Sequence, residues 1–346
     1  MYGATAGQVG ILNFQSSTNQ AVCGIFPNEN FIPEFIYYRF LEYQDQLIQQ
    51  AVGGAQPNIS QQKIKNTLIP EINISEQKKI VAILDKAFEA IDQAKANIER
   101  NIENAKELFQ SKLNEIFSQQ GEGWEEKSFQ ELSSRIGDGL HGTPQYDDEG
   151  DYFFINGNNL NDGVIEIKDS TKRVNRLEFE KHQRPLTDNT VQISINGTLG
   201  KVAFYNNEPV ILGKSACYIN FDSRVEKRYI KFLVQSTLFF ENMGRESTGA
   251  TIKNFSLKSM RNYKLFLPPV EAQVKIVGEL ELFDSYIKEL KESYFQKFRS
   301  LEELKKSLLQ KAFAGELTQD EAKVKELINE PLGMVAEERA EYNKDS

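Results

Sequence analysis

An internal repeat with a period near 195 residues constrains this 346-residue chain more than any other feature. From Asn58 onward the two copies align without a gap at a shift of 196, so Asn58 matches Asn254 and Gln77 matches Gln273. Such a chain must fold as two similar modules in succession rather than as one continuous domain.

The later part of each copy predicts a long helix with a narrow apolar seam. Apolar or small residues recur at steps of three and four, beginning at Ile80 in the first copy and at Ile276 in the second. Residues 71–123 and 271–317 contain no proline. Each range can therefore form a helix of about 40 residues, which is about 60 Å long.

Two seams of matched length and spacing favour packing of the two helices against each other. The chain passes through a globular module between them, which favours an antiparallel pair. The alternative is that each helix packs on its own globular module, because periodicity alone does not identify the partner of a seam.

The rest of each copy predicts an α+β fold. Alternating and β-branched residues indicate strands at 191–195, 201–205 and 216–221, with an Asn196-Gly197 turn after the first. Helical spacing indicates a helix at 229–240, and residues 137–163, rich in Gly, Asp and Asn, indicate loops. The second module begins near Trp124, whereas Met1 already aligns beside Ile195. We therefore expect the first module to be partial and N-terminally truncated, by about 70 residues.

The net charge of −9 is unevenly distributed along the chain. The tail 316–346 has 4 basic and 9 acidic residues, whereas 168–231 has 12 basic and 7 acidic, and 245–264 has 5 and 1. A polyanion responds to these local stretches because screening acts over about 10 Å. No apolar run approaches the ~18 residues of a membrane span, and two cysteines cannot form a disulfide framework, so we expect a cytoplasmic protein.

Most catalytic patterns are missing from the sequence. There is no phosphate-binding Gly-x-x-x-x-Gly-Lys-Ser/Thr loop, and the two histidines lack metal-ligand spacing, so we expect no cofactor and no metal. One pattern leaves an alternative open: Asp151 with Glu166 and Lys168 has the residue types of a metal-dependent nuclease. A protein-binding coiled-coil scaffold is the other alternative.

Four sequence motifs together resemble the specificity (S) subunits of type I restriction–modification systems. They are Asp138-Gly139-Leu140-His141-Gly142-Thr143-Pro144, the stretches 1–10 and 195–202 that resemble a Gly-x-x-Gly-x-Val segment, the helix junction from Pro268 to Val277, and the helix end from Leu308 to Leu317. Each motif alone is weak, but their order matches the repeat, and the resemblance covers all but the last ~30 residues.

The resemblance implies β-rich DNA target-recognition domains joined by two long antiparallel coiled-coil spacer helices. Applied to this chain, it predicts a partial first recognition domain at 1–70, a first spacer helix at 71–123, a second recognition domain at 124–270, a second spacer helix at 271–317 and an acidic tail at 318–346. It also implies a non-catalytic subunit that reads a bipartite site in double-stranded DNA. Its partners would be methyltransferase (M) subunits docked on the helices and restriction (R) subunits recruited through the complex.

The motif around His141 and the basic stretches provide the candidate DNA-binding residues. Lys and Arg neutralise phosphates, whereas Thr and His can reach phosphates or base edges. The candidates are His141, Thr143, Lys172, Arg173, Lys201, Lys214, Arg245, Thr248 and Lys253. For His141 a structural role in ordering its Gly-rich loop is an equal alternative.

Overall fold

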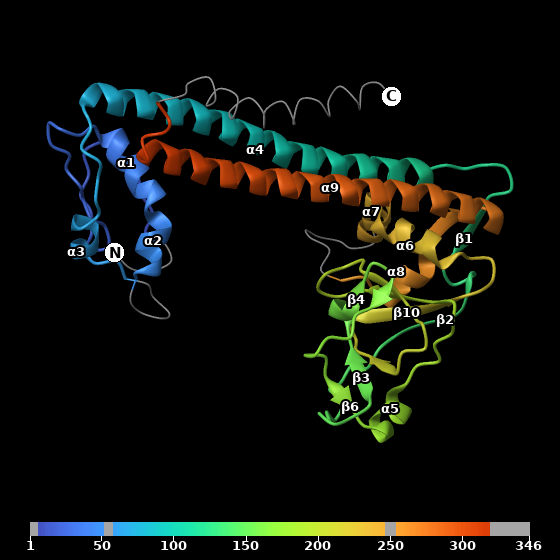
Figure 1. Cartoon of the computed structure of the whole chain (residues 1–346). Helices are drawn as coiled ribbons and strands as arrows, with labels where there is room; N and C mark the ends of the chain where they lie inside the picture. Colours follow the sequence, from blue (N-terminus) through green and yellow to red (C-terminus); the bar gives the residue numbers. More distant parts are fainter. Residues whose placement is uncertain (1–5, 52–57, 246–253, 319–346) are drawn as a thin grey trace. The chain divides into compact units, whose positions relative to one another are not determined.

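The computed structural model describes residues 6–51, 58–245 and 254–318 of the chain. Two compact units divide it: a first unit of Met1–Glu103 with Leu290–Ser346, and a second unit of Asn104–Glu289. Helices and strands are mixed in the second unit (Figure 1), so the predicted α+β class is confirmed.

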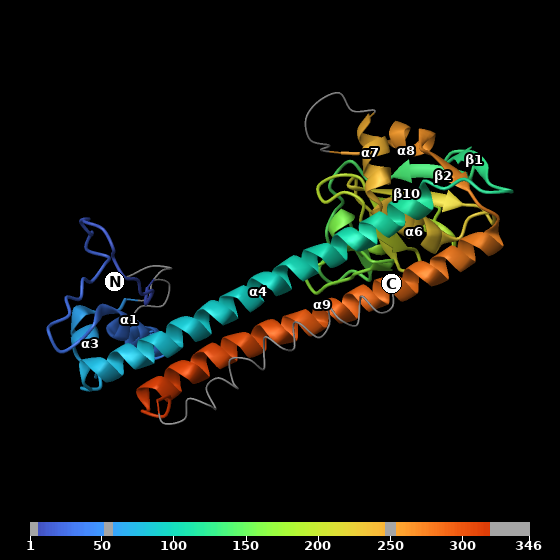
Figure 2. The same ribbon diagram turned by 90° about the horizontal axis from the view of Figure 1, so that it is seen from above.

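Both long helices are present, as α4 (Ile74–Phe117) and α9 (Val270–Phe313), with 44 residues each. In the first unit they are antiparallel, as two ion pairs show. Lys95 is paired with Glu302, and the earlier residue Asp92 lies 3.6 Å from the later residue Lys305. In the second unit the rings of Phe109 and Phe283 lie 6.0 Å apart. Within each unit the two ribbons run side by side in both views (Figures 1 and 2).

In the first unit the seam of α4 is buried against two partners. Leu84, Ala87 and Ile98 are fully buried in one cluster with Leu301 of α9. The same cluster includes Phe35 of α1 (Pro33–Glu42). Packing on the other long helix and packing on the module therefore occur together. The remaining helices before α4 are α2 (Gln44–Gln49) and α3 (Gln61–Lys65).

The centre of the second unit is a four-stranded antiparallel sheet in the order β2-β10-β7-β8. Its strands are β2 (Ser133–Asp138), β10 (Ala216–Phe221), β7 (Thr190–Ser194) and β8 (Val202–Phe204). A three-stranded sheet in the order β6-β3-β9 lies next to it, with β3 and β9 parallel. Its strands are β6 (Arg173–Val174), β3 (Tyr152–Ile155) and β9 (Val210–Leu212).

Side chains of the central sheet enter two different cores, because they alternate along each strand. Cys217 and Ile219 of β10 pack in a core with the long helices, whereas Ala216 and Tyr218 pack with β3 and β9. Two short antiparallel pairs complete the sheets: β1 (Glu125–Ser128) with β11 (Lys264–Leu267), and β4 (Leu160–Asn161) with β5 (Val164–Ile165). The remaining helices are α5 (Arg176–His182), α6 (Lys227–Gln235), α7 (Thr237–Arg245) and α8 (Leu257–Asn262).

Three local predictions need correction. The expected helix 229–240 is two helices, because Ser236 is extended and its hydroxyl, which donates to the Leu233 carbonyl, also accepts from the Phe239 N–H. The expected Asn-Gly turn is part of a wider loop, 195–201. The expected loop region 137–163 contains β3, whose pairing with β9 is distant in sequence.

A buried glutamine ties the start of each long helix to its module. Gln273 Oε1 accepts the Glu226 N–H, and its Nε2 donates to the carbonyls of Arg224 and Pro268, all at 2.8 Å. Gln77 makes the same pattern with the Ile32 N–H at 3.0 Å and with the carbonyls of Asn30 at 2.7 Å and Ile72 at 2.9 Å. The repeat seen in the sequence is thus repeated in hydrogen bonding.

Candidate nucleic-acid interface

Four loops of the second unit meet at one end of the central sheet, where β2 and β7 end and β10 and β8 begin. We name them the loop cluster: 139–146, 156–159, 196–200 and 213–215. Leu140 and Gly213 form a β-bridge, and the Lys214 N–H donates to the Leu140 carbonyl at 3.0 Å. This pairing places the loop with His141 beside the loop with Lys214. Both side chains are exposed, as is Thr143.

Ser215 joins two further loops to this pair. Its hydroxyl accepts the Gly157 N–H at 2.9 Å, and its carbonyl accepts the Ile195 N–H at 2.9 Å. A Cβ at Gly157 would lie 2.9 Å from the Cβ of Ser194, so the close approach of these loops requires glycine. The loops of the cluster are therefore held together by hydrogen bonds and by close packing at Gly157.

Lys172 reaches the loop cluster through an aromatic side chain. Its Nζ lies 5.8 Å from the centre of the Tyr146 ring, which is 6.1 Å from the ring of Phe154. Arg173 points away from Tyr146, and its guanidinium carbon lies 5.1 Å from the centre of the Phe153 ring. Both cations are predicted DNA-binding residues, and side-chain alternation places them beside different aromatic rings.

Lys201 and His141 both have acidic neighbours. Lys201 is half-buried, and its N–H donates to the Ser194 hydroxyl at 2.8 Å. The pKa of Glu166 is lowered, chiefly by a hydrogen bond from Asn161, then by Lys168, with a smaller contribution from Lys201. His141 Nε2 lies 2.6 Å from Asp138 Oδ2, while 73% of its side chain is exposed. The carboxylate orients the ring without covering it.

Three predicted residues cannot be placed. Thr248 and Lys253 lie outside the described residues, as does the side chain of Arg245. The described chain resumes at Asn254, which forms an antiparallel bridge with Asn196. It therefore resumes next to the 196–200 loop.

Two of the three residues of the nuclease alternative, Glu166 and Lys168, are engaged with other groups. Glu166 accepts from Asn161 at 2.5 Å and forms an ion pair with Lys168 at 3.0 Å. Within residues 6–51, 58–245 and 254–318, no group of three or more His, Cys, Asp or Glu side chains is arranged to hold a metal ion.

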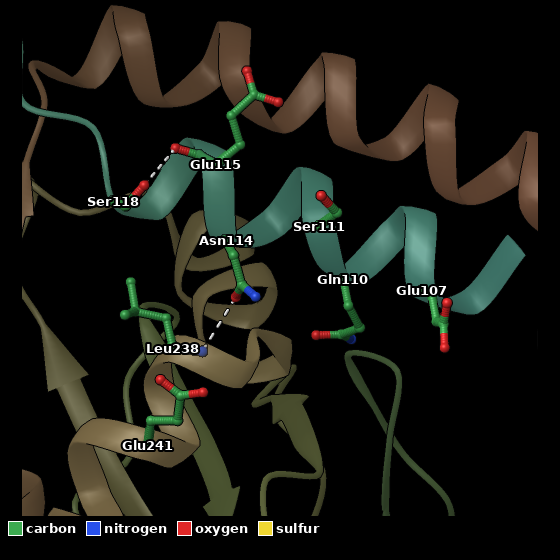
Figure 3. Close-up of a pocket in the computed structure, with 8 residues that line it drawn as sticks. All are labelled: Glu107, Gln110, Ser111, Asn114, Glu115, Ser118, Leu238 and Glu241. Atoms are coloured by element: carbon green, nitrogen blue, oxygen red, sulfur yellow. Dashed lines mark hydrogen bonds between the residues drawn. The ribbon is translucent and has the colours of Figure 1, made fainter. Parts of the chain in front are cut away.

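A hollow of about 640 Å³ between α4 and α7 has the wrong charge for DNA. It is lined by Glu107, Gln110, Ser111, Asn114, Glu115, Ser118, Leu238 and Glu241 (Figure 3). Three carboxylates would repel phosphate. Two amides of the hollow bind the start of α7. Asn114 Oδ1 accepts the Leu238 N–H and Gln110 Oε1 accepts the Thr237 N–H, both at 3.2 Å.

A family model for the type I restriction modification DNA specificity domain matches residues 1–104 and 121–294. The chain belongs to this family. The resemblance inferred from the motifs is therefore confirmed. Members of this family are the non-catalytic DNA-recognition subunits of type I systems, as the motifs predicted. No similarity favours the nuclease or the scaffold alternative.

Known members of the specificity family align with most of the chain. The EcoBI specificity subunit of Escherichia coli is 21% identical over 327 residues, which are 87% of this chain and 69% of that protein. The StySPI specificity subunit of Salmonella potsdam is 23% identical, over 86% of this chain and 68% of that protein.

Solved structures of specificity proteins share the fold. The HsdS subunit from Thermoanaerobacter tengcongensis has a TM-score of 0.54 at 23% identity, covering 84% of this chain and 72% of that one. A chain from a structure of type I R-M complex assembly and conformational transition has a TM-score of 0.67 at 22% identity, covering 82% and 72%. No helix in the described part of this chain is long and apolar enough to cross a membrane.

Two exposed side chains of the loop cluster were missed by sequence reasoning. They are Asn158 on the 156–159 loop and Thr198 on the 196–200 loop. The Gly-x-x-Gly motif contains Thr198 and could have indicated it. Asn158 belongs to a run of Asn and Gly that predicts only a loop.

Proposed function

We propose that the second recognition domain, 124–270, reads one part of a DNA site through the loop cluster. The observation that carries this proposal is the meeting of four hydrogen-bonded loops that expose His141, Thr143 and Lys214, with Lys172 alongside. Cations position a duplex by its phosphates, whereas short polar side chains on fixed loops read base edges.

The long helices are proposed to serve as spacers between the two parts of a bipartite site. A helix of 44 residues is about 66 Å long, which corresponds to about 19 base pairs of duplex at 3.4 Å each. The partial first recognition domain at 1–70 would belong to the other part of the site, and the tail at 318–346 would follow the spacers.

The assembly partners are proposed from the relatives. Known specificity subunits belong to type I restriction enzymes, and one similar chain comes from a type I R-M complex. We therefore propose that this chain docks M subunits and recruits R subunits through the complex. Because its substrate is the cell's or an invader's DNA, we also propose a cytoplasmic location.

Salt-dependent binding to duplex DNA tests the proposal. Lys214→Ala should weaken binding to all sequences and reduce the slope of log K against log [salt] by about 1, because one phosphate contact is lost. Lys264→Ala is the control, since Lys264 is an exposed cation on β11 paired with Glu126 at 3.1 Å. Equal slopes for wild type and Lys214→Ala would remove Lys214 from the interface.

A further inference from the structure

We propose that Asn158 is a base-reading residue of this DNA-specificity protein and that the base it selects is adenine. The inference rests on the proposed function of the loop cluster. It adds a specificity-determining side chain that neither the sequence motifs nor the basic stretches identify.

The turn that contains Asn158 is hydrogen-bonded to the loop that contains Lys214. Gly157, the neighbour of Asn158, donates its N–H to the Ser215 hydroxyl. The residue before Ser215 is Lys214, whose backbone is paired with the loop that contains His141. A duplex held by Lys214 and His141 would therefore come within reach of Asn158.

The backbone around Asn158 is fixed before any DNA binds. Asn156 Oδ1 accepts the Asn158 N–H at 3.0 Å. Asn159 closes the loop from the other side, because its Oδ1 accepts the Asn156 N–H at 3.1 Å and its Nδ2 donates to the Glu166 carbonyl at 2.9 Å. A reading side chain must be held in position by its surroundings if it is to distinguish bases that differ by single atoms.

The side-chain amide of Asn158 takes no part in these hydrogen bonds. Asn156 and Asn159 use their side chains inside the loop, and Asn159 is buried. Asn158 is exposed, and in the described parts of the chain its side chain forms no hydrogen bond. An amide presents one donor and one acceptor together, the arrangement that pairs with N7 and N6 of adenine in the major groove.

Selection of DNA from a pool of randomised duplexes tests this assignment. The full chain is used, and the bound DNA is sequenced for wild type, Asn158→Ala and the control Asn206→Ala. Asn206 is also exposed, but it follows the opposite end of β8 from the 196–200 loop. We expect Asn158→Ala to lose the adenine preference at one position by roughly 5- to 150-fold while the other positions keep theirs.

Two outcomes would overturn the assignment. Asn158→Ala could retain the full wild-type preference, or it could weaken every position equally with an unchanged melting temperature. If the wild-type chain enriches no sequence at all, the proposed function of the loop cluster fails and the role of Asn158 fails with it. The control Asn206→Ala should enrich the same sequences as wild type.

Discussion

Replacing Gln273 by alanine should destabilise the second unit strongly. Gln273 is fully buried, and alanine would leave the Glu226 N–H and the carbonyls of Arg224 and Pro268 without their partner. An unsatisfied buried group costs about 1–3 kcal/mol; one of these contacts is buried and two are part-buried, so we expect a loss of about 4 kcal/mol.

The single tryptophan makes this loss measurable in one unit. Trp124 lies in the second unit, so its fluorescence during urea denaturation reports the unfolding of that unit. Glu279→Ala is the control, because Glu279 is exposed on the same helix within the second unit. A shift of less than about 1 kcal/mol for Gln273→Ala, or one equal to that of the control, would refute the reasoning.

Three further changes test other contacts. Burial raises the pKa of Asp162, but hydrogen bonds from Lys231 and Lys288 outweigh this and lower it. The stabilisation is therefore present above the unfolded pKa near 4 and is lost as the pH falls through the lower folded value. Asp162→Asn should reduce stability at pH 7 by about 1 kcal/mol. In denaturation curves measured from pH 6 to 2, the variant should lose less stability than wild type as the pH falls. An unchanged pH profile would show that the ion pairs of Asp162 do not stabilise the fold. Gly157→Ala should force a Cβ against Ser194, cost about 1–3 kcal/mol and weaken DNA binding in a mobility-shift assay, and wild-type binding would show that the close contact is unnecessary. Asn114→Ala removes an acceptor at the start of α7 and should lower the free energy of unfolding by about 1 kcal/mol by the Trp124 assay, whereas Ser111→Ala in the same hollow should have little effect.

The long helices could be predicted from the sequence because their signal is local. Steps of three and four define a seam wherever the partner lies, and the helices begin at Ile74 and Val270, close to the expected positions. The strands at 191–195 and 216–221 could also be predicted, because alternating and β-branched residues mark them. β3 was not, because its pairing with β9 depends on residues more than 50 positions away.

The candidate site was only partly predictable for the same reason. The motif around His141 and the cation Lys214 could be selected by residue type, but their pairing depends on the Leu140–Gly213 bridge. Residue type also could not separate Lys172 from Arg173, because their different aromatic neighbours, Tyr146 and Phe153, depend on how β6 pairs with β3. Asn158 has no charge and belongs to no motif. It differs from Asn156 and Asn159 only in that their side-chain amides form hydrogen bonds within the loop.

The amide contacts between α4 and α7 have a consequence for exchanging modules between proteins. The first N–H groups of α7 are satisfied by Gln110 and Asn114, which belong to the preceding helix and not to the stretch that begins at Trp124. Leu113 and Ile116 of that helix are also buried in the same core as Tyr229. A graft cut at Trp124 would leave the Thr237 and Leu238 N–H groups without their acceptors and would open the core, whereas a graft of Asn104–Glu289 would keep these contacts.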